Sequence, residues 1–288
     1  MNNLQVGTKA TLTVKRVIDT GYVLTNDDAE VLLHKNEAID NLEDGDEVEV
    51  FLYQDKKGEI VATQVLPEAD IDTYDWAEVV EVISDLGVFV DIGIQKAILV
   101  SKDDLPLYRE AWPEVGDVLH VILDTDKKGR LLAVPMSEST FEDEFEDAPD
   151  DLMNQPISGR VIRSSREGAV IVTEEGYRGF IHYSESKRDP RLGEWVKGRV
   201  IQVKNDGTLN VSLRPLKQEA IDVDSETILE FLKHHDGVMP YSDKSDPEEI
   251  YNMFDMSKAA FKRALGKLMK SNRVEQKDGK TYIKEKDS

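Results

Sequence analysis

The residues best placed to do chemistry are cations near the C-terminus of the 288-residue chain. The cations of this stretch are Lys258, Lys262, Arg263, Lys267, Lys270 and Arg273. No acidic residue interrupts them. On a helix over residues 257–271, the first five would point away from an apolar stripe of Phe261, Leu265 and Leu268, which suits contact with phosphates. The alternative is an ordinary solvated helix face.

Patterns that would support catalysis or metal binding are missing from the sequence. It holds no cysteine, glycine-rich phosphate loop or Ser-His-Asp set. His234 and His235 are adjacent, and consecutive helical residues point about 100° apart, so we expect no metal site there. The carboxylates of residues 142–151 surround Pro149 and resemble a flexible acidic linker rather than a rigid magnesium site. We therefore expect no enzyme activity and no cofactor.

The charge is unevenly distributed. The net charge of the whole chain is −22, which argues against a nucleic-acid partner. Residues 1–153 hold 12 basic and 36 acidic residues, a net −24, whereas residues 154–216 hold 11 and 7, a net +4. Residues 256–286 hold 10 and 3, a net +7. Asymmetry of this kind places a nucleic-acid site in the C-terminal half.

One pattern of five short strands occurs three times. Glycine-bounded hairpins recur at residues 45–58, 116–129 and 193–207, each preceded by three strands of alternating apolar residues. Repeats of about 70 residues with five strands predict small antiparallel barrels. Three barrels that bind no ligand remain the alternative.

The third copy, residues 158–185, resembles the S1 RNA-binding domain, which has the OB fold. Its opening Gly-x-Val, its Gly-Ala strand and its Gly-Phe-Ile-His-x-Ser-Glu segment follow that family's pattern. The resemblance implies an RNA-binding histidine at His182. The two aromatic positions fall on Glu167 and Val170, and the family's Asp and Arg fall on Lys204 and Asn210. We therefore expect weak base stacking, with phosphate contacts from the cations of this copy. These are Arg160, Arg163, Arg166, Arg178 and Lys204.

Each of the other copies keeps one part of that pattern. The first copy has His34 at the histidine position but Val23 at an aromatic position. The second copy has Phe89 at an aromatic position but Ser101 in place of the histidine. We interpret Phe89 as a core residue rather than a platform for bases. For His34, ligand contact and an ordinary strand role stay equally open.

After Arg214 and Pro215 the apolar period changes to that of helices. Ser225 is the expected N-cap of a first helix, and Asp246-Pro247 begins a second. A third helix over residues 257–271 is followed by a hairpin around Asp278-Gly279, which together resemble a winged helix-turn-helix. Some winged helices bind proteins, and the third helix lacks an evident base-reading pattern.

The predicted architecture is mainly β. It consists of S1-like OB barrels at residues 1–68 and 69–140, an acidic linker at 141–153, an S1 barrel at 154–216 and an α/β winged helix at 222–288. This order resembles the conserved virulence factor B family of bacterial regulators, which implies an RNA-binding role that influences expression of virulence genes.

We accordingly expect single-stranded RNA, bound by the third barrel and the winged helix, as the partner. DNA bound by the winged helix, or a protein-interaction scaffold, remain alternatives. No apolar run suits a signal peptide or a membrane span, so we expect a cytoplasmic location and no membrane contact.

Overall fold

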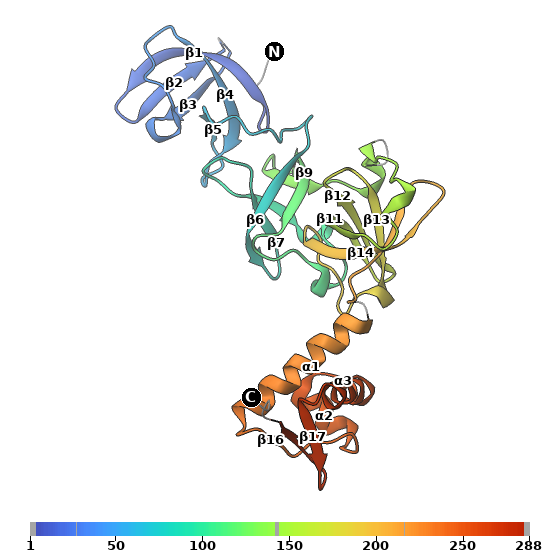
Figure 1. Cartoon of the computed structure of the whole chain (residues 1–288). Coiled ribbons are helices and arrows are strands. Elements are labelled where there is room, and N and C mark those ends of the chain that lie inside the picture. Colours follow the sequence, from blue (N-terminus) through green and yellow to red (C-terminus); the bar gives the residue numbers. More distant parts are fainter. Residues whose placement is uncertain (1–3, 27, 142–143, 216, 285–288) are drawn as a thin grey trace. The chain divides into compact units, whose positions relative to one another are not determined.

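The computed structural model describes residues 4–26, 28–141, 144–215 and 217–284. It divides into two compact units, residues 1–213 and 214–288. The first unit contains three closed five-stranded barrels, as the repeats predict, and the second contains the helices (Figure 1).

The three barrels share one strand order. In barrel 1 the strands are β1 Lys9–Ile18, β2 Gly21–Thr25, β3 Glu30–His34, β4 Glu47–Gln54 and β5 Ile60–Thr63. In barrel 2 they are β6 Asp75–Ile83, β7 Gly87–Asp91, β8 Ile98–Ser101, β9 Val118–Thr125 and β10 Leu131–Pro135. In barrel 3 they are β11 Pro156–Ser165, β12 Gly168–Thr173, β13 Arg178–His182, β14 Trp195–Val203 and β15 Leu209–Ser212. In each, the first three strands are antiparallel neighbours, and the fifth strand pairs parallel to the third to close the barrel.

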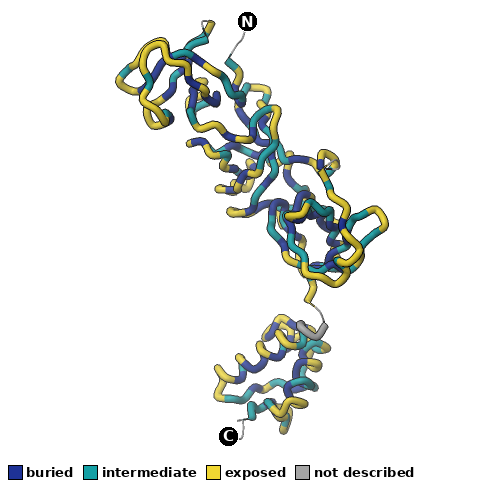
Figure 2. The backbone as a smooth tube through the Cα atoms, turned by 45° about the horizontal axis from the view of Figure 1, so that its top comes forward, coloured by how far each residue is buried: buried dark blue, intermediate teal, exposed yellow. Residues whose placement is uncertain are grey.

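The register repeats as closely as the order. Each first strand shifts register against the second at an equivalent place, between Val14 and Arg16, Val79 and Glu81, and Val161 and Arg163. Buried and exposed residues alternate along most strands, as Figure 2 shows, so each barrel encloses its own apolar core. The S1-like fold class is confirmed.

The second unit has the winged-helix order. Its elements are α1 Lys217–His234, β16 Val238–Met239, α2 Pro247–Phe254, α3 Lys258–Lys270, β17 Val274–Lys277 and β18 Lys280–Ile283. Asp246 caps α2 by accepting a hydrogen bond from the N–H of Glu248 at 2.8 Å, as expected. Asp278 and Gly279 both have positive φ, which suits the predicted hairpin turn.

The expected start of the first helix is wrong. Helix α1 begins at Lys217, so Ser225 lies in its interior, and residues 217–221 are helix rather than a connector. The Ser225 hydroxyl donates to the carbonyl of Ile221 within the helix. A serine that bonds back four residues in this way can lie mid-helix, which explains why its residue type misled the prediction.

The prediction of a flexible linker over residues 141–153 is also wrong. Among its described residues, Phe141 and Ala148 are buried, and the Ala148 N–H donates to the carbonyl of Gly207 at 3.0 Å. Glu146 forms a parallel β-bridge with Tyr177. The apolar side chains in this acidic run attach it to barrel 3.

Candidate nucleic-acid interface

Barrels 2 and 3 meet at a closely packed seam. The Val118 N–H donates to the carbonyl of Gly193 at 3.0 Å, and the Leu192 N–H donates to that of Ala111 at 2.9 Å. Gly193 has φ +81°, and a Cβ added there would lie 2.8 Å from the Val118 carbonyl oxygen. Arg191 pairs with Asp117 across the seam at 2.9 Å. The two barrels therefore contact each other through backbone as well as side chains.

Two of the arginines expected to bind phosphate also lie in this seam. The guanidinium of Arg160 lies 5.1 Å from the ring centroid of Trp195 and 5.9 Å from that of Trp76. Burial lowers the pKa of Arg160, and its NH1 donates to the Gly193 carbonyl at 3.0 Å. The guanidinium of Arg166 lies 4.3 Å from the ring centroid of Tyr108, although Arg166 remains exposed. Both cations hold barrel 3 against barrel 2.

A short segment covers the outer face of β11, β12 and β13. We call residues 136–141 the strap. Its Met136 and Phe141 are buried against Ile162 and Val170 of barrel 3, and Val170 is fully buried. Val170 is the position where the S1 pattern has an aromatic ring. This part of the face is therefore a packing surface within the chain.

The strap also engages two expected phosphate ligands. One carboxylate oxygen of Glu138 lies 3.0 Å from Nε of Arg163, and the other accepts from Nε of Arg178 at 2.8 Å. The side chain of Arg178 is 23 % exposed, against 46 % for Arg163. Arg178 thus has mainly a structural contact here, whereas Arg163 keeps part of its surface open.

Beyond the strap, the end of β13 stays open. His182 and Tyr183 are exposed there, and their ring centroids are 4.3 Å apart. The backbone N–H of Tyr183 donates to the carbonyl of Glu167 in the β11–β12 turn at 3.1 Å. The sequence prediction included His182 but missed Tyr183, although that ring directly follows the matched histidine. Lys204 does not lie at this end: it begins the β14–β15 hairpin, and because Leu209 of β15 pairs with Gly179, that hairpin is beside the start of β13. Lys204 is partly exposed there, and no ion pair of its side chain is found among the described residues.

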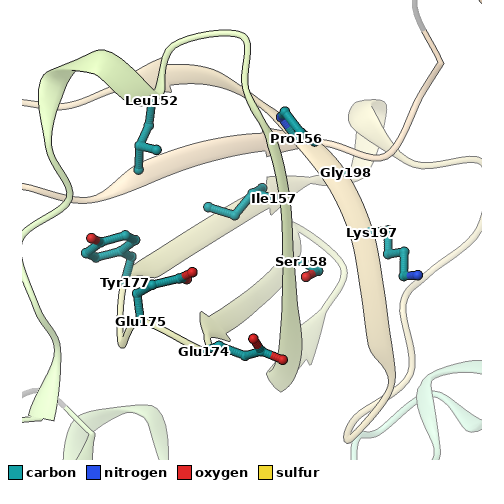
Figure 3. Close-up of a pocket in the computed structure, with 9 residues that line it drawn as sticks. All are labelled: Leu152, Pro156, Ile157, Ser158, Glu174, Glu175, Tyr177, Lys197 and Gly198. Carbon is teal, nitrogen blue, oxygen red and sulfur yellow. The ribbon is translucent and has the colours of Figure 1, made fainter.

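The opposite end of β12 and β13 has a different character. A pocket of about 460 Å³ lies there, lined by Ile157, Lys197 and residues of the β12–β13 turn (Figure 3). Glu174 and Glu175 are exposed at its rim. These two carboxylates would repel a phosphate chain at this pocket.

The equivalent positions of barrels 1 and 2 differ in exposure: Val23 is buried, and Ser101 is partly buried. His34 is exposed at the end of β3, beside a pocket that also contains Lys56 and Lys96. The interpretation of Phe89 as a core residue is wrong. Phe89 is only partly buried, on the outer face of β7, while Val88 and Val90 on either side of it are fully buried.

In the second unit, helix α3 presents its cations as predicted. Phe261, Leu265 and Leu268 are buried, and Lys262, Arg263 and Lys270 are exposed on the other side, with Lys258 partly exposed. No ion pair of these four cations is found within the described part of the unit.

The remaining two cations of that set contact α1. Lys267 pairs with Asp222, and NH1 of Arg273 lies 3.0 Å from Oε1 of Glu226. These two side chains stabilise the packing of α1 on α3, so the free charge of the helix lies with the other four.

Other sites are not evident in the structure. No group of three or more potential metal ligands occurs in the described ranges, and no described helix is long and apolar enough to cross a membrane.

His120 is half-buried in a ring cluster with Tyr74, Trp76 and Phe141, and burial is the main cause of its lowered pKa.

Comparisons with known proteins agree with this architecture. Family models match as the CvfB-like winged helix domain over residues 226–283, the CvfB first S1-like domain over 74–134, the second domain of virulence regulatory factor CvfB over 141–215, and an S1 domain over 6–65.

Relatives match nearly the whole length. The Bacillus subtilis protein YitL is 47% identical over 98% of this chain and 95% of its own. Conserved virulence factor B of Staphylococcus aureus is 38% identical over the same shares. A crystal structure from Streptococcus pneumoniae, described as a multidomain protein with nucleic acid binding domains, is 35% identical with a TM-score of 0.66, covering 97% of this chain and 98% of that one. The chain belongs to the conserved virulence factor B family.

Proposed function

We propose that this chain is a non-enzymatic regulatory protein that binds single-stranded RNA and influences gene expression after transcription. The observation that carries the proposal is the set of cations on α3 that face solvent without an ion pair in the described unit: Lys258, Lys262, Arg263 and Lys270. Such a row supplies phosphate contacts at any sequence. We also propose the cytoplasm as the place of action, on the ground of its S1 and winged-helix domains.

We propose that barrel 3 supplies the second contact. His182, Lys204, Arg163 and Arg166 retain exposed surface, so they are the residues of that barrel that we assign to RNA. Arg160 and Arg178 were expected to bind phosphate, and we assign them an indirect part, in which they hold the barrel through their contacts with Gly193 and Glu138. Lys267 and Arg273 form ion pairs with carboxylates of α1, and these pairs would have to break before either cation could bind an RNA phosphate.

The experiment is filter binding of the full chain to single-stranded RNA and to duplex DNA of equal length. We expect RNA to be retained more strongly. The row of cations on α3 also suits a DNA groove, so stronger retention of duplex DNA would favour a transcription factor, and retention of neither would favour a protein scaffold.

The same assay tests the proposed phosphate ligands. Replacing Lys262 and Arg263 together with Ala should weaken RNA binding by about 1 kcal/mol for each phosphate that the variant no longer binds. It should also make the slope of log affinity against log salt shallower by about 0.7 for each phosphate. Lys233→Ala removes an equally exposed cation from α1 and serves as the control. If Lys233→Ala and the α3 double variant weaken binding equally, α3 has no particular role.

A further inference from the structure

We propose that Tyr183 and His182 form a stacking subsite for one unpaired RNA base at the open end of barrel 3. This inference rests on the proposed function and adds to it a contact that is not electrostatic. It would replace the two stacking rings that are absent at Glu167 and Val170.

The Tyr183 ring is both exposed and supported by its neighbours. Tyr183 is 60% exposed, whereas Phe180, two residues before His182 on β13, is half-buried against the strap cluster. The His182 ring lies against Tyr183 at 42°, and the Tyr183 backbone is bonded to Glu167. A ring that is already held in place loses little conformational freedom when a base stacks on it.

The contacts with Ser184 fix the tautomer of the neutral His182 ring. Its Nδ1 accepts a hydrogen bond from the backbone N–H of Ser184 at 3.3 Å and lies 2.7 Å from the Ser184 hydroxyl. A backbone N–H can only donate, so Nδ1 is the acceptor and the neutral ring carries its proton on Nε2. The Nε2–H is thus a donor beside the Tyr183 ring, available for a base carbonyl or a phosphate oxygen.

The surroundings of Tyr183 are polar and of mixed charge. The neighbours of Tyr183 along the chain are Ser184, Glu185 and Lys187, and the adjacent turn holds Arg166 and Glu167. A protein-binding hot spot is usually enclosed by apolar contacts that exclude water. A single supported ring with an N–H donor and mixed charges around it fits a nucleotide better. Since the adjacent acids offset Arg166, the ring rather than net charge would supply the affinity.

The test compares two strands on the full-length chain. One is an oligoadenylate of about ten nucleotides, within the usual range for one OB fold, and the other is an abasic strand of the same length. We expect Tyr183→Ala to weaken binding of the oligoadenylate at least about fivefold, the lower end of a stacked base, and to leave binding of the abasic strand unchanged. The salt slope should also stay that of the wild type.

Two variants serve as controls. Tyr183→Phe keeps the ring and should bind like the wild type, while Tyr251→Ala removes a tyrosine of α2 that is equally exposed, at 60%, and should have no effect. Because Tyr183 is exposed, its replacement should change stability by no more than about 0.5 kcal/mol, which thermal unfolding will check.

Each outcome bears on the subsite. Unchanged oligoadenylate affinity in Tyr183→Ala would refute stacking and leave protein contact as the use of the ring. Equal losses of affinity on both strands would show a phosphate contact or a folding defect, and would also overturn the proposal. If the wild-type chain binds neither strand, the proposed function itself fails, which these data separate from failure of the subsite alone.

Discussion

The strap can be tested by removing its single carboxylate. Glu138→Ala takes away the partner of both Arg163 and Arg178 while keeping Met136 and Phe141, the apolar contacts of the strap. We therefore expect lower stability of the first unit with the cover still in place. The matched control is Glu174→Ala, which removes an exposed carboxylate from the same barrel.

The size of the effect follows from exposure. The half-exposed pair with Arg163 contributes at most about 1 kcal/mol, as surface pairs do. Glu138 is 17% and Arg178 23% exposed, so that pair lies between a surface pair and a buried one, whose disruption costs about 3–5 kcal/mol. A total of about 2 kcal/mol is reasonable, which would lower Tm by about 4–8 °C for a unit of this size.

Thermal unfolding of the full-length chain measures this shift, and hydrogen exchange locates it. Amides of β11 and β13 should lose protection more than those of barrel 1. A double-mutant cycle of Glu138→Ala with Arg178→Ala should give a coupling free energy of about 1 kcal/mol or more. A Tm shift no larger than that of Glu174→Ala, or zero coupling, would refute the view that these ion pairs hold the strap.

Two further predictions concern the contact between barrels 2 and 3. Burial lowers the pKa of His120, so the folded chain binds fewer protons than the unfolded chain, and stability should fall as pH decreases through about 6.5, by at most about 1.4 kcal/mol per pH unit. Tm measured between about pH 7.5 and about pH 5.5, a range that brackets the ordinary histidine pKa, should show this fall. His120→Gln should reduce it, whereas exposed His234→Gln should not. Gly193→Ala should destabilise more than Gly116→Ala. Both glycines have positive φ, but only at Gly193 would the new Cβ meet the neighbouring barrel, so equal decreases in Tm would contradict a tight seam.

Local patterns were enough to predict the barrels and the winged helix. Glycines at hairpin turns and alternating apolar residues determine strand positions directly, and the same holds for the cap at Asp246 and the turn at Asp278. The two errors of element assignment have a shared cause. Ser225 and the acidic run near Glu146 have residue types that are typical of helix starts and linkers, but tertiary packing decides their conformation.

The candidate site was harder to predict because exposure and pairing depend on contacts between modules. From sequence, Arg160, Arg163 and Arg178 are equivalent cations, yet Trp76 and Glu138 reach them only once barrel 2 and the strap pack on barrel 3. The strap also buries Val170. The exposed aromatic ring that remains beside the matched histidine is that of Tyr183.

The strap covers part of the outer face of barrel 3, and this limits how RNA could bind to that barrel. A face covered by Phe141 cannot stack several bases in a row, so we expect base stacking by barrel 3 only at its open end, near His182. A contact limited to about one base gives little sequence discrimination, since every base has a face that can stack. The phosphate contacts that we propose for α3 would add affinity without discrimination. On this view, selection among RNAs depends on whether a strand is unpaired where it meets Tyr183 more than on its sequence.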